Sequence, residues 1–444
     1  MAQAVPTSAG HQTDGEPAAL PIAPELHGRL RVCGDCGLLL LLPTFQPGTD
    51  CLCPRCAALL HRDRHFLLTT PLALAVASLI LCGVTLTTPF LTVRFLGRTR
   101  GSTIESGAWS FLDDGLWLLA AIVLGTVVLV PLLRLCLRLV VLGGLSLRQP
   151  PPWLFRPLRW HGHLGVWSML EIFLLGAVVS YIRLSGLVEV QFGPAAYCLG
   201  VSVLGMTVAD ACFEQLAVWN RMEMRGAMAS APQTVPKPTG PQDAATRPST
   251  LGCSCCRGAT LASPGTPCPR CGTPLHHRKP ASVSRTWALI IAAAILYVPA
   301  NLCPVMAIVT FGRGSPHTIV GGIIEFVATG YWPLALLLCF ASVVVPLAKL
   351  AGLSVMLLQI RRGSIRALRQ RTRLYRLIAV LGRWSMVDIF VVAVLVALLR
   401  FGGMVSVTAE IGAACFGAVV VLTMLATESF DPRLMWDAVE ARLD

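Results

Sequence analysis

The chain carries an internal duplication, and this repeat constrains the fold more than any other feature. Leu381–Phe390 (LGRWSMVDIF) repeats Leu164–Phe173 (LGVWSMLEIF) with seven identities in ten positions. The alignment continues in the same register, without a gap, as far as the pair Trp219 and Trp436. Upstream, a register that differs by only two positions aligns the two CPRC motifs. We therefore expect a fold built from two copies of one unit.

Composition identifies the class of that unit. Hydrophobic residues make up 55% of the chain and charged residues 13%, about half the charged share of soluble domains. The apolar residues gather into eight stretches, four per repeat, that are free of charge or interrupted by one acid. A membrane helix needs roughly 20 such residues. The sequence predicts an α-helical polytopic membrane protein with eight spans, over Phe66–Val93, Gly115–Leu133, Leu164–Ile182, Phe192–Ala209, Thr286–Gly312, Phe326–Ala348, Trp384–Leu399 and Ile411–Thr427.

The net charge of +13 comes largely from basic residues placed between the predicted membrane spans, so it gives no reason to expect a nucleic-acid partner. Basic residues without acids fill the connections between spans 2 and 3 and between spans 6 and 7. Positive charge marks the cytoplasmic side, so both termini are predicted to be cytoplasmic. The connections on the other side are short and alternate in polarity, which predicts small β elements on the non-cytoplasmic side. They fall near Phe90–Phe95, Val188–Phe192, Val305–Phe311 and Val405–Ala409.

Each repeat begins with a cysteine motif of metal-ligand spacing. In the first repeat, the pair Cys33 and Cys36 precedes the pair Cys53 and Cys56; in the second, a shorter spacer separates Cys253 and Cys256 from Cys268 and Cys271. Two CxxC turns close a tetrahedron of four thiolates around one ion. We predict two structural Zn²⁺ ions, one per cytoplasmic ribbon, because four protein ligands leave no open position. Iron is the alternative metal, and paired disulfides are disfavoured in a reducing compartment.

These features divide the chain into six segments. The polar N-terminus lacks the pattern of a cleaved signal peptide, and the Pro-rich segment between the repeats is typical of a flexible linker. Both repeats enter the membrane from the same side, which makes them parallel repeats. The predicted segments are a disordered N-terminus (1–31), zinc ribbon 1 (32–65), a four-helix module (66–225), the linker (226–250), zinc ribbon 2 (251–280) and a second four-helix module (281–444).

Ionisable residues inside the spans are the candidate functional site, since they are costly there and usually functional. Lys349 interrupts an apolar run, and Asp388 on the next span can offset its burial. Such a pair can also carry a proton. Snorkelling of Lys349 to the interface is the alternative. The predicted transport cluster is Ser342, Lys349, Ser385, Asp388 and Thr423, and its first-half counterpart is Arg134, Ser168 and Glu171.

The motifs together resemble the paraquat-inducible protein A family, which includes the A component of the lipophilic envelope-spanning tunnel. The resemblance rests on the paired ribbons and on the second-half motifs Pro299–Pro304 (PANLCP), Tyr331–Ala335 (YWPLA), Ser342–Lys349 (SVVVPLAK) and Trp384–Phe390 (WSMVDIF). It implies a bacterial inner-membrane protein that partners a mammalian-cell-entry (MCE) domain protein, which forms a periplasmic tunnel. It also implies lipid movement between the two membranes. The first half departs from the pattern, with Thr87-Thr88-Pro89 in place of the Pro-Ala-Asn motif.

Two classes of function follow. The first is a lipid-transport subunit driven by an ion gradient, since no phosphate-binding G-x-x-x-x-G-K-[ST] motif occurs. The second is a membrane-bound zinc or redox sensor, or an assembly scaffold. No catalytic arrangement stands out, so we expect no enzymatic activity. The histidine pairs His161/His163 and His276/His277 are interpreted as solvated surface residues.

Overall fold

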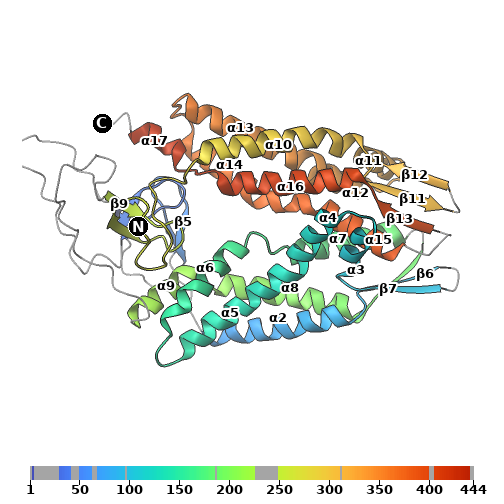
Figure 1. Ribbon diagram of the computed structural model, residues 1–444, viewed down its shortest axis with the longest axis horizontal. Coiled ribbons are helices and arrows are strands. Elements are labelled where there is room, and N and C mark those ends of the chain that lie inside the picture. Colours follow the sequence, from blue (N-terminus) through green and yellow to red (C-terminus); the bar gives the residue numbers. More distant parts are fainter. Residues whose placement is uncertain are drawn as a thin grey trace, which may run out of the picture.

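A computed structural model describes residues 3–4, 30–41, 50–62, 68–95, 98–185, 188–225, 249–310, 313–399 and 405–440. Most of the predicted disordered N-terminus and of the predicted linker lies outside the described residues. The molecule consists of two helical halves side by side, with both ribbons at one end and short strands at the other (Figure 1). The helical fold, its duplication and its two four-cysteine clusters agree with the prediction from sequence.

The two halves share one order of elements. The first half comprises α2 (Thr69–Thr87), β6 (Leu91–Phe95), β7 (Arg98–Ser102), α3 (Ser106–Asp113), α4 (Trp117–Leu124), α5 (Val130–Ser146), α6 (Phe155–Leu164), α7 (Leu170–Ser185), β8 (Glu189–Phe192), α8 (Pro194–Cys212) and α9 (Gln215–Met224). The second half comprises α10 (Ser282–Leu302), β11 (Met306–Thr310), β12 (Arg313–His317), α11 (Ile319–Ala328), α12 (Trp332–Cys339), α13 (Val345–Arg361), α14 (Leu368–Leu381), α15 (Val387–Leu398), β13 (Val405–Ala409), α16 (Ile411–Ser429) and α17 (Leu434–Glu440).

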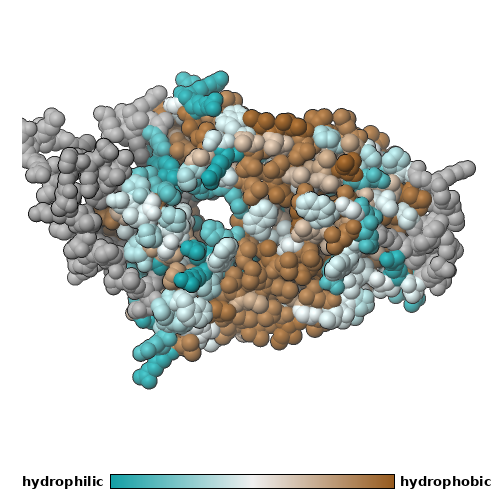
Figure 2. All heavy atoms as spheres, in the orientation of Figure 1, coloured by the Kyte–Doolittle hydropathy of each residue, from teal (hydrophilic) through white to brown (hydrophobic). Residues whose placement is uncertain are grey.

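Seven helices within the described residues are long and apolar enough to cross a membrane. They are Thr69–Thr87, Trp117–Ser146, Pro194–Cys212, Ser282–Leu302, Trp332–Arg361, Leu368–Leu398 and Ile411–Ser429. The eighth expected span falls on α7, whose 16 residues rise only about 24 Å. A hydrophobic band covers the helical region, and hydrophilic residues gather at the ribbon end (Figure 2).

The expected strands form, and each half adds one that the sequence analysis missed. β6 pairs antiparallel with both β7 and β8, and β11 pairs in the same way with β12 and β13. The missed strands, β7 and β12, each contain Gly, β12 also contains Pro, and both lack a clear alternation of polarity. Each three-stranded sheet therefore takes its central strand from the segment after the first span.

Each half also contains one π-helical segment, at the same position of the repeat. Gly125–Leu129 joins α4 to α5, and Phe340–Val344 joins α12 to α13. Pro131 and Pro346 each stand one residue beyond these segments and lack the N–H that an α-helix would donate to the carbonyl four residues earlier. The wider turn keeps each helix continuous past its proline. It also places Ser342 inside the second π segment, where its side chain meets α15.

This continuity corrects the placement of two basic residues. Arg134 and Arg138 follow Leu133, where the sequence analysis ended the second span, but both lie within α5, which runs on to Ser146. Arg138 is buried and Arg134 is nearly so. They remain inside the helix because their guanidinium groups find partners there, as described below.

The joint between the halves is formed by α7 and α15, the two helices that continue the repeated motif. The rings of Phe173 and Phe390 lie 5.7 Å apart in an edge-on arrangement. A Cβ atom added to Gly176 would stand 3.0 Å from Phe390 Cβ, so a glycine is needed for this approach. All twelve residues of α15 are buried. The core of the molecule is therefore shared between the two repeats.

Candidate metal centres and buried polar site

Each four-cysteine cluster is built from two identical turns. In ribbon 1, which contains β2 (Leu30–Val32), β3 (Leu39–Leu41), β4 (Asp50–Leu52) and β5 (Leu59–Arg62), the N–H of Cys33 donates to the carbonyl of Leu38. The strand β1 (Gln3–Ala4) pairs with β3. Ribbon 2 contains β9 (Ser249–Gly252) and β10 (Ala259–Ala262) and repeats these turns. The residue after the second cysteine of each turn has a positive φ, as shown by Gly37, Ala57, Arg257 and Gly272.

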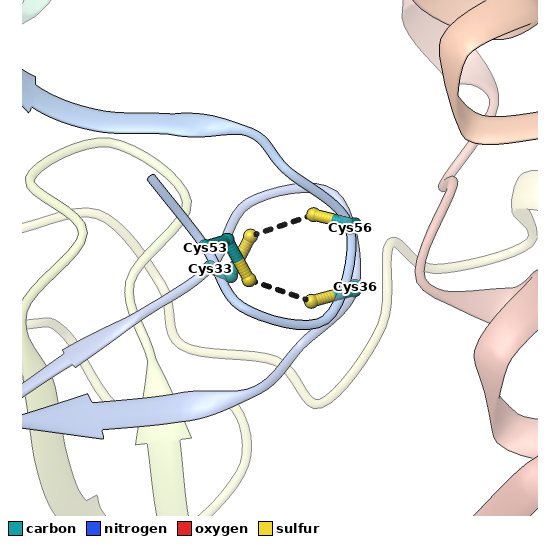
Figure 3. A group of neighbouring side chains, drawn as sticks. All are labelled: Cys33, Cys36, Cys53 and Cys56. Atoms are coloured by element: carbon teal, nitrogen blue, oxygen red, sulfur yellow. Dashed lines mark hydrogen bonds between the residues drawn. The ribbon is translucent and has the colours of Figure 1, made fainter. Parts of the chain in front are cut away.

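The ligand atoms of each cluster lie within 4.8 Å of one another. In ribbon 1 the four sulfur atoms point toward one centre (Figure 3). In ribbon 1 the Sγ atoms of Cys33 and Cys56 are 3.6 Å apart, as are those of Cys36 and Cys53. In ribbon 2 the corresponding separations are 3.4 and 3.8 Å. A tetrahedron with metal–sulfur bonds of about 2.3 Å has edges of about 3.8 Å. All eight cysteines are buried within thiol sets that could hold a metal ion.

The ribbons dock crosswise, which sequence reasoning did not anticipate. Ribbon 1 packs against the second half, where its cysteines share a buried cluster with Leu353, Phe430 and Trp436. Ribbon 2 packs against the first half, in a cluster with Leu145 and Trp219. The two ribbons also touch each other, since the N–H of Val32 donates to the carbonyl of Arg257 at 3.3 Å.

Arg376 on α14 fixes ribbon 1 to the second half. Its Nε donates to Asp35 Oδ2 at 2.6 Å, and its Nη2 donates to the carbonyl of Cys56 at 3.0 Å and approaches Cys56 Sγ at 3.5 Å. Arg369, two turns earlier, donates to the carbonyls of Pro54 and Arg55. The basic face of α14 thus holds ribbon 1, with its cysteine cluster, against the second half.

In the structure, four of the five residues of the predicted second-half cluster form two hydrogen-bonded pairs, Ser342 with Asp388 and Lys349 with Thr423. Ser342, Lys349, Ser385, Asp388 and Thr423 are all buried, with exposed fractions between 0 and 7%. Ser342 Oγ donates to Asp388 Oδ2. Lys349 Nζ donates to the carbonyl of Gly382 at 2.7 Å and to Thr423 Oγ1 at 3.2 Å. The expected pairing of Lys349 with Asp388 is wrong, because Lys349 bonds to neutral oxygens instead.

The acid of this cluster is only partly satisfied. Asp388 Oδ1 and Ser385 Oγ are buried and have no hydrogen-bond partner within the described part of the chain. Asp388 also borders two small cavities of about 20 and 40 Å³, which Arg183 of the first half lines as well. Cavities of this size can hold one or a few water molecules. The free carboxylate oxygen therefore lies beside space that water can occupy.

The first-half counterpart is arranged differently from the prediction. Arg134 and Glu171 do not pair, because Arg134 Nη1 donates to Asp210 Oδ2 at 2.9 Å and Glu171 is exposed. Ser168 is buried. Arg138 Nη2 also donates to Asp210. Asp210 directly follows a charge-free stretch of the sequence. Two arginines buried in a helix need a negative partner, and this need was the signal that could have identified Asp210.

His161 on α6 completes this group and corrects a second interpretation, because it is buried and not solvated. Its Nε2 lies 3.3 Å from Arg138 Nε, which donates to it. Burial, together with the charges of Arg138 and Arg134, lowers the pKa of His161 to about 2. The ring is therefore neutral at physiological pH and accepts the hydrogen bond.

The two polar groups open into one cavity of about 1060 Å³ between the halves. Arg134, Glu171 and Asp210 line it from the first half, and Lys349 and Arg383 from the second. An opening between the halves is visible in the space-filling view, where the hydrophilic ribbon end meets the hydrophobic band (Figure 2). The cavity thus combines charges of both signs with proximity to apolar surface, which suits an amphiphilic ligand.

Comparison with known proteins identifies the family. A family model described as Paraquat-inducible protein A matches residues 68–223 and again residues 283–440. The chain belongs to this family. The two matches coincide with the two helical halves and leave out both ribbons.

Relatives within the paraquat-inducible protein A family cover almost the whole chain. The Intermembrane transport protein PqiA of Escherichia coli K12 is 31% identical over 408 residues, which is 91% of this chain and 95% of the relative. The Lipophilic envelope-spanning tunnel protein A of the same organism is 29% identical and covers 93% and 92%. A Probable intermembrane transport protein of Haemophilus influenzae is 27% identical and covers 91% and 95%. No solved structure matches the chain.

The docking of ribbon 1 yields a testable prediction. Replacing Arg376 with Ala removes the hydrogen bonds that its guanidinium group donates to two carbonyls and to Asp35. A hydrogen bond that involves a charged group stabilises the folded state by about 1.5–3 kcal/mol. We expect faster proteolytic cleavage between ribbon 1 and the first span in the Arg376→Ala variant. Arg373→Ala is the matched control, because Arg373 lies on the same helix but is exposed. Equal cleavage rates for the two variants would contradict the assigned role.

Proposed function

We propose that this protein is an inner-membrane subunit of a lipid transport system, which passes lipids between the membrane and a periplasmic tunnel protein. The observation that carries the proposal is the cavity between the halves. Its charged lining and its position beside the hydrophobic band match a ligand with a polar head and apolar tails. The names of two relatives, which refer to intermembrane transport and to an envelope-spanning tunnel, support the same reading.

We further propose that an ion gradient drives this transport through the buried second-half cluster. Lys349 lines the large cavity on the ribbon side, and Asp388 borders the small cavities toward the strands. A proton bound by Asp388 could thus be exchanged with either side through water and the intervening hydroxyls. Arg134 at the aligned position of the first half does not release its proton in practice, which leaves the second half as the working site.

The two thiol clusters are proposed to hold structural Zn²⁺. Four cysteine ligands on two tight turns leave no open coordination position, and such sites act through folding. The cytoplasm, where we place both ribbons and both termini, keeps thiols reduced. This placement rests on the basic residues near the ribbon end, which include those of α14.

The partner is proposed to be an MCE-domain tunnel protein that contacts the strand end. That end presents two small three-stranded sheets and short connections, which gives a compact surface rather than a receptor domain of its own. The sensor alternative has one supporting observation, the half-buried thiol of Cys255 beside the second cluster. A sensor, however, leaves the large cavity without a role.

The metal proposal predicts two zinc ions per chain in purified protein by elemental analysis. The Cys268→Ser variant should lose one of them and accumulate to lower levels, because the ribbon no longer folds. Cys136→Ser, which alters an exposed thiol outside both clusters, should retain two. Fewer than one ion per wild-type chain, or mainly iron, would refute the assignment.

The transport proposal predicts that Asp388→Asn and Lys349→Ala fail to restore transport-dependent growth to a deletion strain, although protein levels stay normal. The physical reason is that both variants remove a titratable group from the buried cluster. Glu171→Gln at the aligned position should have a milder effect, because Glu171 is exposed. Full growth with both second-half variants would show that the cluster does not drive transport.

The partner proposal predicts crosslinks between the strand end and a periplasmic tunnel protein. A photoreactive residue at Ser315 on β12 should capture the partner, whereas one at Ser284 near the ribbon end should not. Both side chains are exposed, which makes the two positions comparable. A survey that recovers only cytoplasmic proteins from both positions would contradict the proposed partner.

A further inference from the structure

The two copies of the repeated motif line the large cavity from opposite halves. Leu164, Gly165, Val166, Trp167 and Glu171 of the first copy face it, as do Gly382 and Arg383 of the second. In the register of the repeat, Val166 aligns with Arg383 and Glu171 aligns with Asp388. The motif therefore contributes different chemistry to each side of the same space.

The differences between the copies separate the charges across the cavity. The first copy has no cation at position 166, and its acid Glu171 is exposed to the cavity. The second copy adds the cation Arg383 and buries its acid Asp388 away from the cavity, against Ser342. One copy thus offers a carboxylate and the other a guanidinium group.

The remaining charges that line the cavity have partners. Arg134 bonds to Asp210, and Lys349 bonds to Gly382 and Thr423. Lys279 Nζ donates to the carbonyls of Glu428 and Phe430 at 2.5 and 3.2 Å, which also places it near the Glu428 carboxylate. Of the other titratable groups, His163 is exposed, and the hydroxyl of Tyr375 donates to the carbonyl of Thr427 at 3.1 Å.

The two motif charges differ from these. Among the described residues, neither Glu171 nor Arg383 takes part in a side-chain hydrogen bond or an ion pair. Glu171 does feel the charge of Arg134. The two side chains are therefore available to a ligand that carries both signs of charge.

We infer that the cavity binds the headgroup of a zwitterionic phospholipid, with its phosphate at Arg383 and its ammonium group at Glu171. This inference rests on the proposed function and adds the class of headgroup to it. An arginine donates two parallel hydrogen bonds to a phosphate. Trp160 and Trp167 also line the cavity, and indole rings attract ammonium groups. An anionic lipid leaves Glu171 unpaired and is repelled by it.

The test uses the full-length protein in detergent and native mass spectrometry, with phosphatidylethanolamine and phosphatidylglycerol of identical acyl chains. Wild-type protein should prefer phosphatidylethanolamine by about tenfold, the value of one charged hydrogen bond. Glu171→Gln should abolish that preference, because it weakens phosphatidylethanolamine binding and removes the repulsion that opposes phosphatidylglycerol binding. Arg383→Gln should weaken binding of both lipids. Arg373→Gln and Glu189→Gln, two exposed residues outside the cavity, should change neither.

Equal binding of the two lipids by wild-type protein, or an unchanged preference in Glu171→Gln, would overturn the inference. A soluble competitor, glycerophosphoethanolamine, separates a lipid from a free headgroup, and its displacement of bound lipid at equal concentration would overturn the lipid as occupant. The measurement needs neither tunnel partner nor ion gradient. A failure of the growth assay would therefore refute the transport proposal without affecting the headgroup preference. Loss of the headgroup preference would refute this inference without affecting the transport proposal.

Discussion

The packing of α7 against α15 is the interaction on which the rest of the structure depends. It joins the two repeats through Phe173 and Phe390, and through a hydrogen bond from Ser180 Oγ to the carbonyl of Val391 at 3.3 Å. Because α15 is buried along its whole length, Asp388 lies inside the protein and not at its surface. The joint therefore creates the desolvated site and at the same time sets the two halves beside the large cavity.

Duplication followed by divergence explains why the halves share a fold but not a chemistry. Position 134 in the first half aligns with Lys349 in the second, and both are cations inside long helices. The first half places the carboxylate of Asp210 against both of its arginines, since a permanent cation inside a membrane needs a charged partner. The second half surrounds its lysine with neutral oxygens, which a group able to lose its proton tolerates. Its acid is stabilised separately by Ser342.

The sequence was sufficient to predict whatever depends on local pattern. The repeat, the apolar spans, the alternating strands and the CxxC turns each leave a signature in a short stretch of chain, and each appears in the structure. The crosswise ribbons, Asp210 and His161 leave no such signature, because each depends on a contact between segments distant in the chain. Arg376 meets Asp35 across 341 residues, and Arg138 meets Asp210 across 72. No periodicity reports contacts of that kind.

The crosswise ribbons then have a mechanical consequence for the cavity. Each ribbon is covalently continuous with one half and packs against the other, so separating the halves at the ribbon end would expose the buried clusters around Phe430 and Trp219. A metal ion held by either thiol cluster would stiffen that tie, since its binding free energy would also be folding free energy. The α7–α15 joint connects the halves a second time, further from the ribbon end. Residues of both halves line the cavity. The two ties between the halves limit how far that lining can rearrange, and a lining that is already in place costs less to order around a ligand.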